Sequence, residues 1–271
     1  MIKYWKFFFK IRVICYILFF AGINPTLNAQ INNAADYYSQ EGVSGAFLLY
    51  NFQTDQFASY NLEDCKRRTV PASTFKILNS IIALEKGVFS NIDEQWQWDG
   101  VERRIKSWNQ NNSLRTGMKY SVVPLYQYVA REVGLDYYNQ ILTEIKFGNA
   151  LTGEKVDEFW LTGPLEISPM EQVQFLIKFI SYDLPFSKEN IDAVKETMLL
   201  EETETYKLFA KTGWAQSDKR NIGWFIGFVQ KGDNYYIFAN RIEADENIRD
   251  SFGTARREIS EKILKDLKIL E

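Results

Sequence analysis

The sequence predicts an α+β fold: a central antiparallel sheet flanked by helices, with a mostly helical subdomain. Strand-like segments gather near both ends of the 271-residue chain, and helical patterns fill its middle. No repeat, low-complexity tract or Pro/Gly-rich linker divides the chain, whose composition is 46% hydrophobic and 25% charged, as is ordinary for a globular domain. Strands contributed by both ends are most simply placed in one sheet that helices cover.

Two hairpins are expected in this sheet. Residues 45–50 and 56–60 are strand-like and flank a short polar turn. Residues 222–229 and 235–239 are also β-rich and are joined by a turn that contains Gly232. One hairpin therefore comes from each end of the chain.

Helices are expected between and after these hairpins. Ser168-Pro169-Met170-Glu171 is a capping box with proline at the first helical position, and apolar residues recur at helical spacing as far as Ile180. Residues 255–270 repeat apolar side chains at helical spacing with charges between them. We interpret both apolar stripes as core-facing surfaces.

The absence of histidine limits the chemistry. With no histidine in the chain, a Ser-His-Asp triad, a Cys-His dyad and a His-ligated zinc site are excluded, and a general base must be another group such as a carboxylate, lysine or tyrosine. The two cysteines are Cys15 and Cys65. We expect no metal site, no internal disulfide in the mature chain, and a buried or incidental thiol at Cys65.

The first 29 residues have the pattern of an export signal. Four basic residues without an acid precede an apolar run of 11 residues at 13–23, and Ala29 offers a small residue for cleavage. That run is shorter than the about 20 residues that span a bilayer, although an uncleaved anchor lengthened by Phe7–Phe9 is the alternative. We therefore predict a signal peptide at 1–29, one domain at 30–271, export to the periplasm, and no stable membrane anchor after cleavage.

The mature chain is acidic. The formal net charge of the whole chain is −3, and loss of the four leader cations leaves 28 basic against 35 acidic residues, a net charge of −7. Non-specific nucleic-acid binding depends on neutralising phosphates, so nucleic acid is not an expected partner. The sequence carries no signal for an oligomeric state.

Ser73 and Lys76 form a candidate nucleophile pair that needs no histidine. Residues i and i+3 share a helix face, so the Ser73 hydroxyl and the Lys76 amine can meet at the start of a helix that follows Pro71. Apolar neighbours would lower the pKa of Lys76 and favour the basic amine. The alternative is an N-capping serine with a surface lysine.

Two later motifs favour the catalytic interpretation. Lys211-Thr212-Gly213 is interpreted as the end of a strand that faces a cleft, where lysine and threonine can hold a substrate carboxylate. Ser121 precedes a helical run and could relay a proton, or it could simply cap that helix.

In this order and spacing, the motifs Ser73-x-x-Lys76, Ser121-x-Val123 and Lys211-Thr212-Gly213 resemble those of class D (oxacillinase-type) serine β-lactamases. The likeness runs from about residue 40 to the C-terminus, and further matching segments lie at 98–100, 108–109, 130–134, 147–149 and 159–161. The resemblance implies a serine β-lactamase/transpeptidase-like fold. It also implies hydrolysis of the β-lactam amide through a serine acyl-enzyme, which would give antibiotic resistance.

The resemblance also implies individual roles. Ser73 would be the nucleophile, and Lys76, carboxylated by CO2 or bicarbonate to N6-carboxylysine, would be the general base; no other cofactor is implied. Ser121 would pass a proton to the leaving nitrogen. The resemblance further implies an oxyanion hole formed by the N–H groups of Ser73 and Trp214. It implies contacts to the substrate carboxylate from Lys211, Thr212 and Arg256 (or its neighbour Arg257). It also implies a carbamate pocket lined by Phe75, Val123, Trp160 and Leu161.

Two alternatives share these motifs. A β-lactam sensor domain is acylated but scarcely turned over, whereas a cell-wall D,D-peptidase acts on D-Ala-D-Ala peptides. The loops around Trp108, Met118 and 214–219 are expected to set the preferred class of β-lactam substrate.

Overall fold

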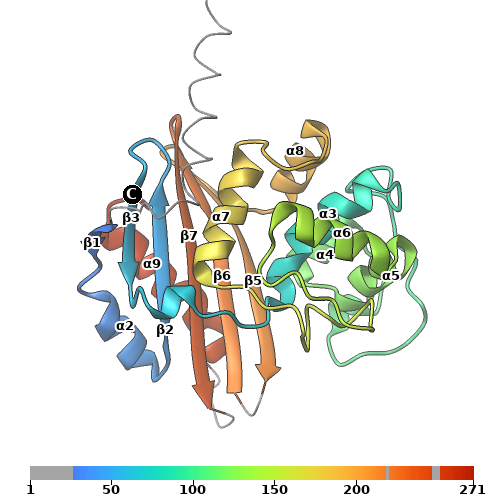
Figure 1. The fold of residues 1–271 in the computed structure, drawn as a ribbon, viewed down its shortest axis with the longest axis horizontal. Helices are drawn as coiled ribbons and strands as arrows, with labels where there is room; N and C mark the ends of the chain where they lie inside the picture. The colour runs from blue at the N-terminus through green and yellow to red at the C-terminus, as the bar shows by residue number, and fades with distance from the viewer. Residues whose placement is uncertain (1–26, 218–219, 246–250) are drawn as a thin grey trace, which may run out of the picture.

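One sheet lies at the centre of the computed structural model, which describes residues 27–217, 220–245 and 251–271 (Figure 1). Its seven strands follow the order β1-β3-β2-β7-β6-β5-β4. All neighbouring strands are antiparallel except β1 and β3, which are parallel. The strands are β1 (Leu27–Gln30), β2 (Ser44–Asn51), β3 (Gln56–Tyr60), β4 (Leu199–Glu202), β5 (Lys207–Ser217), β6 (Arg220–Lys231) and β7 (Asn234–Asp245).

The two expected hairpins are confirmed and meet in the middle of the sheet. They are β2–β3 and β6–β7, and β2 from the first pairs with β7 from the second. Strands β6 and β7 are longer than predicted, because their pairing continues from Lys231 opposite Asn234 to Arg220 opposite Asp245. The expectation that both ends of the chain share one sheet is therefore correct.

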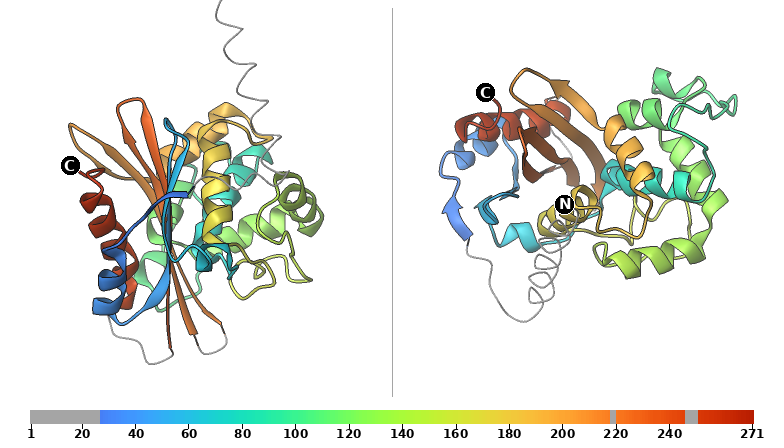
Figure 2. Two further views of the ribbon diagram at one scale, coloured as in Figure 1. Left: turned by 60° about the vertical axis from the view of Figure 1, so that its left-hand side comes forward. Right: turned by 90° about the horizontal axis from the view of Figure 1, so that it is seen from above.

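Helices cover both faces of this sheet (Figure 2). Helices α2 and α9 lie on one face, and α7 lies on the other, beside a group of helices that forms the subdomain. The α-helices are α2 (Ala34–Glu41), α3 (Lys76–Glu85), α4 (Leu114–Tyr120), α5 (Val123–Val133), α6 (Leu135–Ile145), α7 (Pro169–Ile180), α8 (Lys188–Thr197) and α9 (Phe252–Asp266). Three short 3-10 helices are η2 (Asp64–Lys66), η3 (Ala72–Phe75) and η4 (Lys106–Trp108).

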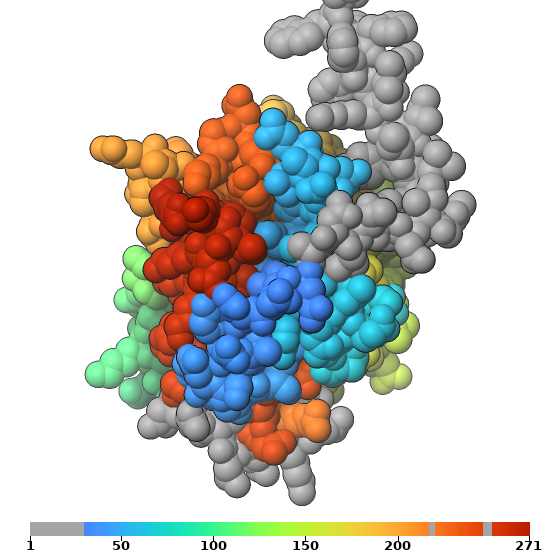
Figure 3. Space-filling model, turned by 90° about the vertical axis from the view of Figure 1, so that its left-hand side faces the viewer, coloured from blue at the N-terminus to red at the C-terminus, as the bar shows by residue number. Residues whose placement is uncertain are grey.

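The core has two apolar layers, one on each side of the sheet. The larger layer joins the sheet to α7 and the helical subdomain. The smaller layer lies beneath α2 and α9, which are side by side on the face seen in Figure 3. The N-terminal and C-terminal helices therefore close one face together, although more than 200 residues separate them in the sequence.

The predicted helix signals are confirmed with one difference. Ser168 and Glu171 form the reciprocal capping box at the start of α7, with proline at the first helical position. The last helix ends at Asp266, so Leu267 and Leu270 of the predicted stripe lie beyond it; Leu270 still packs on the core, whereas Leu267 is exposed.

The predicted leader stays a prediction. The apolar run at 13–23 lies outside the described residues, whereas Leu27–Gln30, at the predicted cleavage point, forms β1. Within the described ranges, none of the helices is both long enough and apolar enough to span a membrane. Cys65 is buried, as expected, and has a free thiol within these ranges.

Gly45 marks a close approach between β2, β7 and α2. A Cβ atom at Gly45 would lie 2.0 Å from the Arg241 carbonyl oxygen and 2.8 Å from Tyr38 Cε1. We expect Gly45→Ala to lower the free energy of unfolding by about 3 kcal/mol, because two main chains must separate to admit one methyl group.

Urea denaturation would measure this effect, with Gly87→Ala as the control. Gly87 has a φ of +67°, but nothing lies within 4 Å of the position that a Cβ atom would take there, so only the left-handed backbone cost of about 1 kcal/mol applies. Equal losses in the two variants would contradict the steric explanation.

Candidate active site

Ser73 and Lys76 meet as the sequence predicts. The Lys76 Nζ atom donates a hydrogen bond to Ser73 Oγ at 3.0 Å, and both side chains are buried. Ser73 lies in the 3-10 turn η3, and Lys76 is the first residue of α3, so the i, i+3 contact spans the junction of the two helices. The alternative of a surface lysine beside a capping serine is wrong, since Lys76 is fully buried.

The surroundings of Lys76 favour its neutral amine. Burial lowers its pKa from 10.5 to about 7. Among the described residues, none of the carboxylates forms an ion pair with Lys76, and its Nζ atom lies 5.0 Å from the centre of the Tyr126 ring. A large fraction of the amine is therefore uncharged and basic near neutral pH.

An aromatic cluster surrounds Phe75, which lies between Ser73 and Lys76 in the sequence. Phe75 stacks on Trp160 with ring centres 5.4 Å apart and meets Phe147 and Phe159 edge to face. Trp160 is fully buried, and its Nε1 donor has no hydrogen-bond partner within the described part of the chain. A buried donor without an acceptor is costly, so it fits a site that receives an acceptor such as a carbamate oxygen.

The other two residues predicted for the carbamate pocket are Val123 and Leu161. Val123 is the first residue of α5, and Leu161 follows Trp160; both are half-buried. Leu161 packs against the same apolar core. A role of these two residues in a carbamate pocket remains a prediction.

Ser121 and Lys211 are brought together from distant parts of the chain. The Lys211 Nζ atom donates to Ser121 Oγ at 2.5 Å and to the Thr212 carbonyl oxygen at 2.9 Å. Ser121 ends α4 in a left-handed conformation, with a φ of +52°, and the Trp108 indole N–H donates to the preceding carbonyl of Tyr120. Ser121 therefore does not cap the start of the following helix.

The strand position predicted for Lys211-Thr212-Gly213 is wrong. These residues lie in the interior of β5, which continues to Ser217 because its pairing with β6 extends to Arg220. Burial, and next the charges of Lys76 and Arg256, hold the pKa of Lys211 well below its usual value. Three basic side chains thus share one site.

Arg256 approaches the same strand from α9. Its Nη1 atom donates to the Gly213 carbonyl oxygen at 2.6 Å, and its guanidinium carbon lies 5.6 Å from the centre of the Trp214 ring. Burial lowers the pKa of Arg256 to about 10, whereas the neighbouring Arg257 pairs with Glu261 on its own helix. Of the two arginines, the structure places Arg256 beside β5.

Two buried side chains that the sequence analysis missed support the nucleophile turn. The Gln172 amide donates to Thr74 Oγ1 at 2.8 Å, and that hydroxyl donates to the Pro71 carbonyl at 2.8 Å. The Trp224 indole N–H donates to the Val70 carbonyl at 3.0 Å. These contacts hold the chain on both sides of Ala72, which has an unusual φ of +51° for a residue other than glycine.

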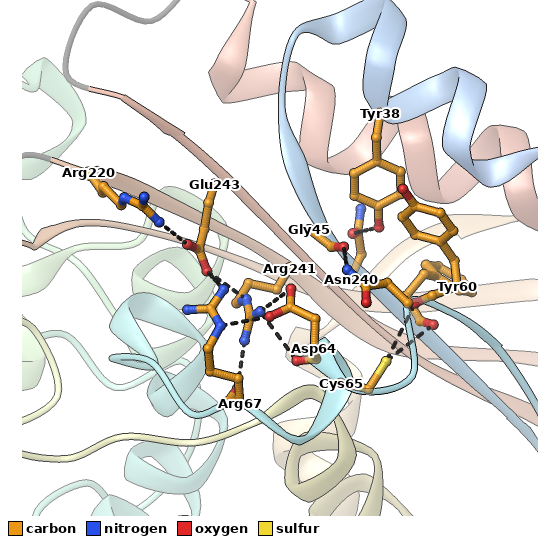
Figure 4. A network of polar contacts seen from close by, with 12 residues as sticks. Tyr38, Gly45, Tyr60, Asp64, Cys65, Arg67, Arg220, Asn240, Arg241 and Glu243 are labelled. Atoms are coloured by element: carbon orange, nitrogen blue, oxygen red, sulfur yellow. Dashed lines mark hydrogen bonds and ion pairs between the residues drawn. The ribbon is translucent and has the colours of Figure 1, made fainter.

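A buried ion network holds the segment that leads to this turn (Figure 4). Arg241, fully buried in β7, pairs with Asp64 at 2.5 Å and donates to the Arg67 carbonyl at 2.6 Å. Arg67 in turn pairs with Glu243 at 2.5 Å, and Arg220 lies 3.5 Å from the other Glu243 oxygen. No local pattern predicts this network, because the contacts of Arg67 with Glu243 and with Arg241 join residues more than 170 apart.

The arrangement is suited to acyl transfer. It combines a serine, a basic amine at its hydroxyl, a second serine held by a lysine, and two basic side chains, Lys211 and Arg256, that could hold an anionic group. In the part of the chain that the structure describes, there is no group of three or more acidic, cysteine or histidine side chains that could hold a metal ion.

This fold and site define a penicillin-binding transpeptidase domain. The family model for the penicillin-binding protein transpeptidase domain matches residues 30–266. Within that class, the chain belongs to the class D β-lactamase family. It is 37% identical over 234 residues to β-lactamase OXA-48 of Klebsiella pneumoniae, covering 86% of this chain and 87% of that protein.

Solved structures and a regulatory protein agree with this assignment of fold. The class D β-lactamase of Sebaldella termitidis superposes with a TM-score of 0.86 at 33% identity, covering 91% of this chain and 100% of that one. The regulatory protein BlaR1 of Bacillus licheniformis is 33% identical over 241 residues, which cover 89% of this chain but 39% of BlaR1. Enzymes and a regulatory protein are thus both relatives.

The low pKa of Lys76 can be tested directly. With 13C-labelled lysine in CO2-free buffer, we expect the Lys76 Cε resonance to titrate with a midpoint near pH 7, charged below it and neutral above it. Loss of the signal in Lys76→Ala identifies it. A midpoint near the ordinary 10.5 would show that the buried amine stays protonated at neutral pH.

Proposed function

We propose that this protein is an exported enzyme that hydrolyses the amide bond of β-lactam antibiotics through an acyl-enzyme on Ser73, and thereby gives resistance. The observation that carries the proposal is the buried Lys76–Ser73 hydrogen bond, which joins a nucleophile to a basic amine in a chain without histidine. The similarity to β-lactamases over most of the chain supports the choice of substrate.

The first chemical step forms the ester. The Lys76 side chain accepts the Ser73 proton, and Ser73 Oγ bonds to the lactam carbonyl carbon. The N–H groups of Ser73 and Trp214 are proposed to hold the developing oxyanion. The carbon–nitrogen bond then breaks, and Ser121 gives its proton to the nitrogen while Lys211, 2.5 Å away, resupplies it. Lys76 then loses its proton to solvent, and Lys211 regains one. Lys76 next takes a proton from the water that attacks the ester carbon, and this proton passes to Ser73 Oγ as the ester carbon–oxygen bond breaks.

A carbamate on Lys76 fits the site. Its formation from CO2 requires a neutral amine, which the pKa of about 7 provides. A carbamate would supply an oxygen base at Ser73, and the unpaired Trp160 indole N–H is a donor suited to its charge. Lys76 is fully buried, and Phe75, the residue before it, packs against the rings of Phe159 and Trp160.

The substrate carboxylate is assigned to the basic side of the site. This side is formed by Lys211 and Thr212 of β5 and by Arg256 of α9. No described carboxylate pairs with Lys211 or Arg256. An anion bound there would relieve the mutual repulsion of the buried charges.

A β-lactam sensor is the second candidate, because the penicillin-receptor domain of BlaR superposes with a TM-score of 0.85 at 32% identity. The two functions differ in the fate of the acyl-enzyme. We expect the purified chain to hydrolyse a chromogenic β-lactam through many turnovers, at a rate that bicarbonate maintains or raises. A stoichiometric burst that stops, whether or not bicarbonate is added, would instead indicate a sensor or a penicillin-binding protein.

The catalytic role of Lys76 gives a stringent test. Lys76→Ala should abolish turnover, because no other described base contacts Ser73 Oγ. Steady-state assays with and without bicarbonate measure this loss. Near-normal rates in the variant would exclude the proposed mechanism.

The role of Trp160 is tested by removing its N–H alone. Trp160→Phe keeps an apolar ring, and Trp160→Ala removes the side chain. Since a hydrogen bond to a charged group contributes about 1.5–3 kcal/mol, we expect either variant to need roughly 10–100 times more bicarbonate for half-maximal activity. Trp98→Phe is the control, because its indole N–H donates to the Val101 carbonyl in a surface loop. An unchanged bicarbonate requirement in the Trp160 variants would contradict the assigned contact.

A further inference from the structure

Asn240 holds the main chain of α9 at one residue, Arg256. Asn240 is fully buried in β7, and its Nδ2 atom donates to the Arg256 carbonyl at 2.8 Å and to Ser260 Oγ at 2.9 Å. Ser260 Oγ donates to the same Arg256 carbonyl at 2.8 Å. The sheet is therefore hydrogen-bonded to α9 at Arg256, the residue whose side chain reaches β5 in the active site.

Tyr38 fixes the direction of the Asn240 amide. The Tyr38 hydroxyl donates to Asn240 Oδ1 at 2.6 Å, so the amide nitrogen must face α9 (Figure 4). The Tyr38 ring stacks on Tyr60 at 4.8 Å and passes over Gly45, whose missing side chain makes room for it. All the hydrogen-bonding groups of the Asn240 side chain thus have partners.

The Arg256 side chain is held at its other end by β5. Its Nη1 atom donates to the Gly213 carbonyl, and its guanidinium lies over the Trp214 ring. Nε has no partner within the described residues, and none of their carboxylates pairs with the guanidinium. Two hydrogen-bonded points therefore set the position of the remaining guanidinium N–H groups. They are the Arg256 carbonyl, bound by Asn240, and the Gly213 carbonyl, bound by Arg256 Nη1.

We propose that Asn240, oriented by Tyr38, is a positioning residue that sets where Arg256 presents its guanidinium to the carboxylate of an anionic substrate. The inference rests on the proposed function, because it takes Arg256 as a substrate contact. A planar guanidinium binds a carboxylate well in a narrow range of directions, so a small shift of α9 weakens the contact without altering Ser73 or Lys76.

A matched pair of variants separates positioning from general stability. Tyr38→Phe removes the hydroxyl that orients Asn240. Tyr37→Phe removes a hydroxyl that links α2 to the far end of α9, at Asp266. We expect Tyr38→Phe to raise KM for a penicillin about fivefold or more with kcat within roughly twofold, and Tyr37→Phe to change neither. Asn240→Leu should act as Tyr38→Phe does, with a larger effect.

Two further measurements show whether the effect passes through Arg256. In an Arg256→Ala background, Tyr38→Phe should no longer change KM, and with the methyl ester of the same penicillin it should have no effect in either background. An unchanged KM in Tyr38→Phe would overturn the proposal. So would a loss of equal size in the Arg256→Ala background or with the ester, since that would indicate a structural role.

The outcome for the wild-type chain is separate. If it is acylated but not turned over, the same comparison uses the second-order rate constant of acylation, and the positioning role is tested as before. If it does not react with β-lactams at all, the proposed function fails, and this role fails with it. An unaltered KM in Tyr38→Phe with an active wild-type enzyme would reject the positioning role alone.

Discussion

Burial of the Lys76 amine against Ser73 is the constraint on which the rest of this structure depends. An ammonium group in a dry aromatic setting without a carboxylate is costly, so the group loses its proton near neutral pH and becomes a base. Creating that setting requires the helical subdomain to close over the start of α3. Phe147 and Trp160, which come from later parts of the chain, therefore pack directly on Phe75.

The same principle extends across the site. Lys211 and Arg256 are also buried basic groups without described acidic partners, their pKa values are lowered by burial, and each donates instead to neutral oxygens. Burial of such groups without a carboxylate is costly, because the charged form loses its hydration without gaining an ion pair. The ion network around Arg241 shows the opposite arrangement, since each of its arginines lies beside a carboxylate of the fold.

Contacts between residues that are close together in the sequence could be predicted. The Ser73–Lys76 contact follows from i, i+3 spacing, and the α7 capping box follows from four consecutive residues. The Lys211–Ser121 contact joins residues 90 apart, and only the family resemblance suggested that they act together. The end of β5 was misplaced because strand length depends on pairing with β6, which no local pattern encodes. Asn240 and Arg241 could not be found for the same reason, since Asn240 joins Tyr38 and Arg241 joins Arg67 across more than 170 residues.

The alternation of side chains along β7 has a consequence for how this chain can change. Adjacent residues, Asn240 and Arg241, serve opposite faces of the sheet, one holding α9 and the other holding the segment before the nucleophile. Inserting or deleting a single residue between Asn234 and Asn240 would exchange the two faces, pointing the amide at Asp64 and the guanidinium at Tyr38. The hairpin turn at Gly232 can vary in length, but the strand that follows it must keep its residue count.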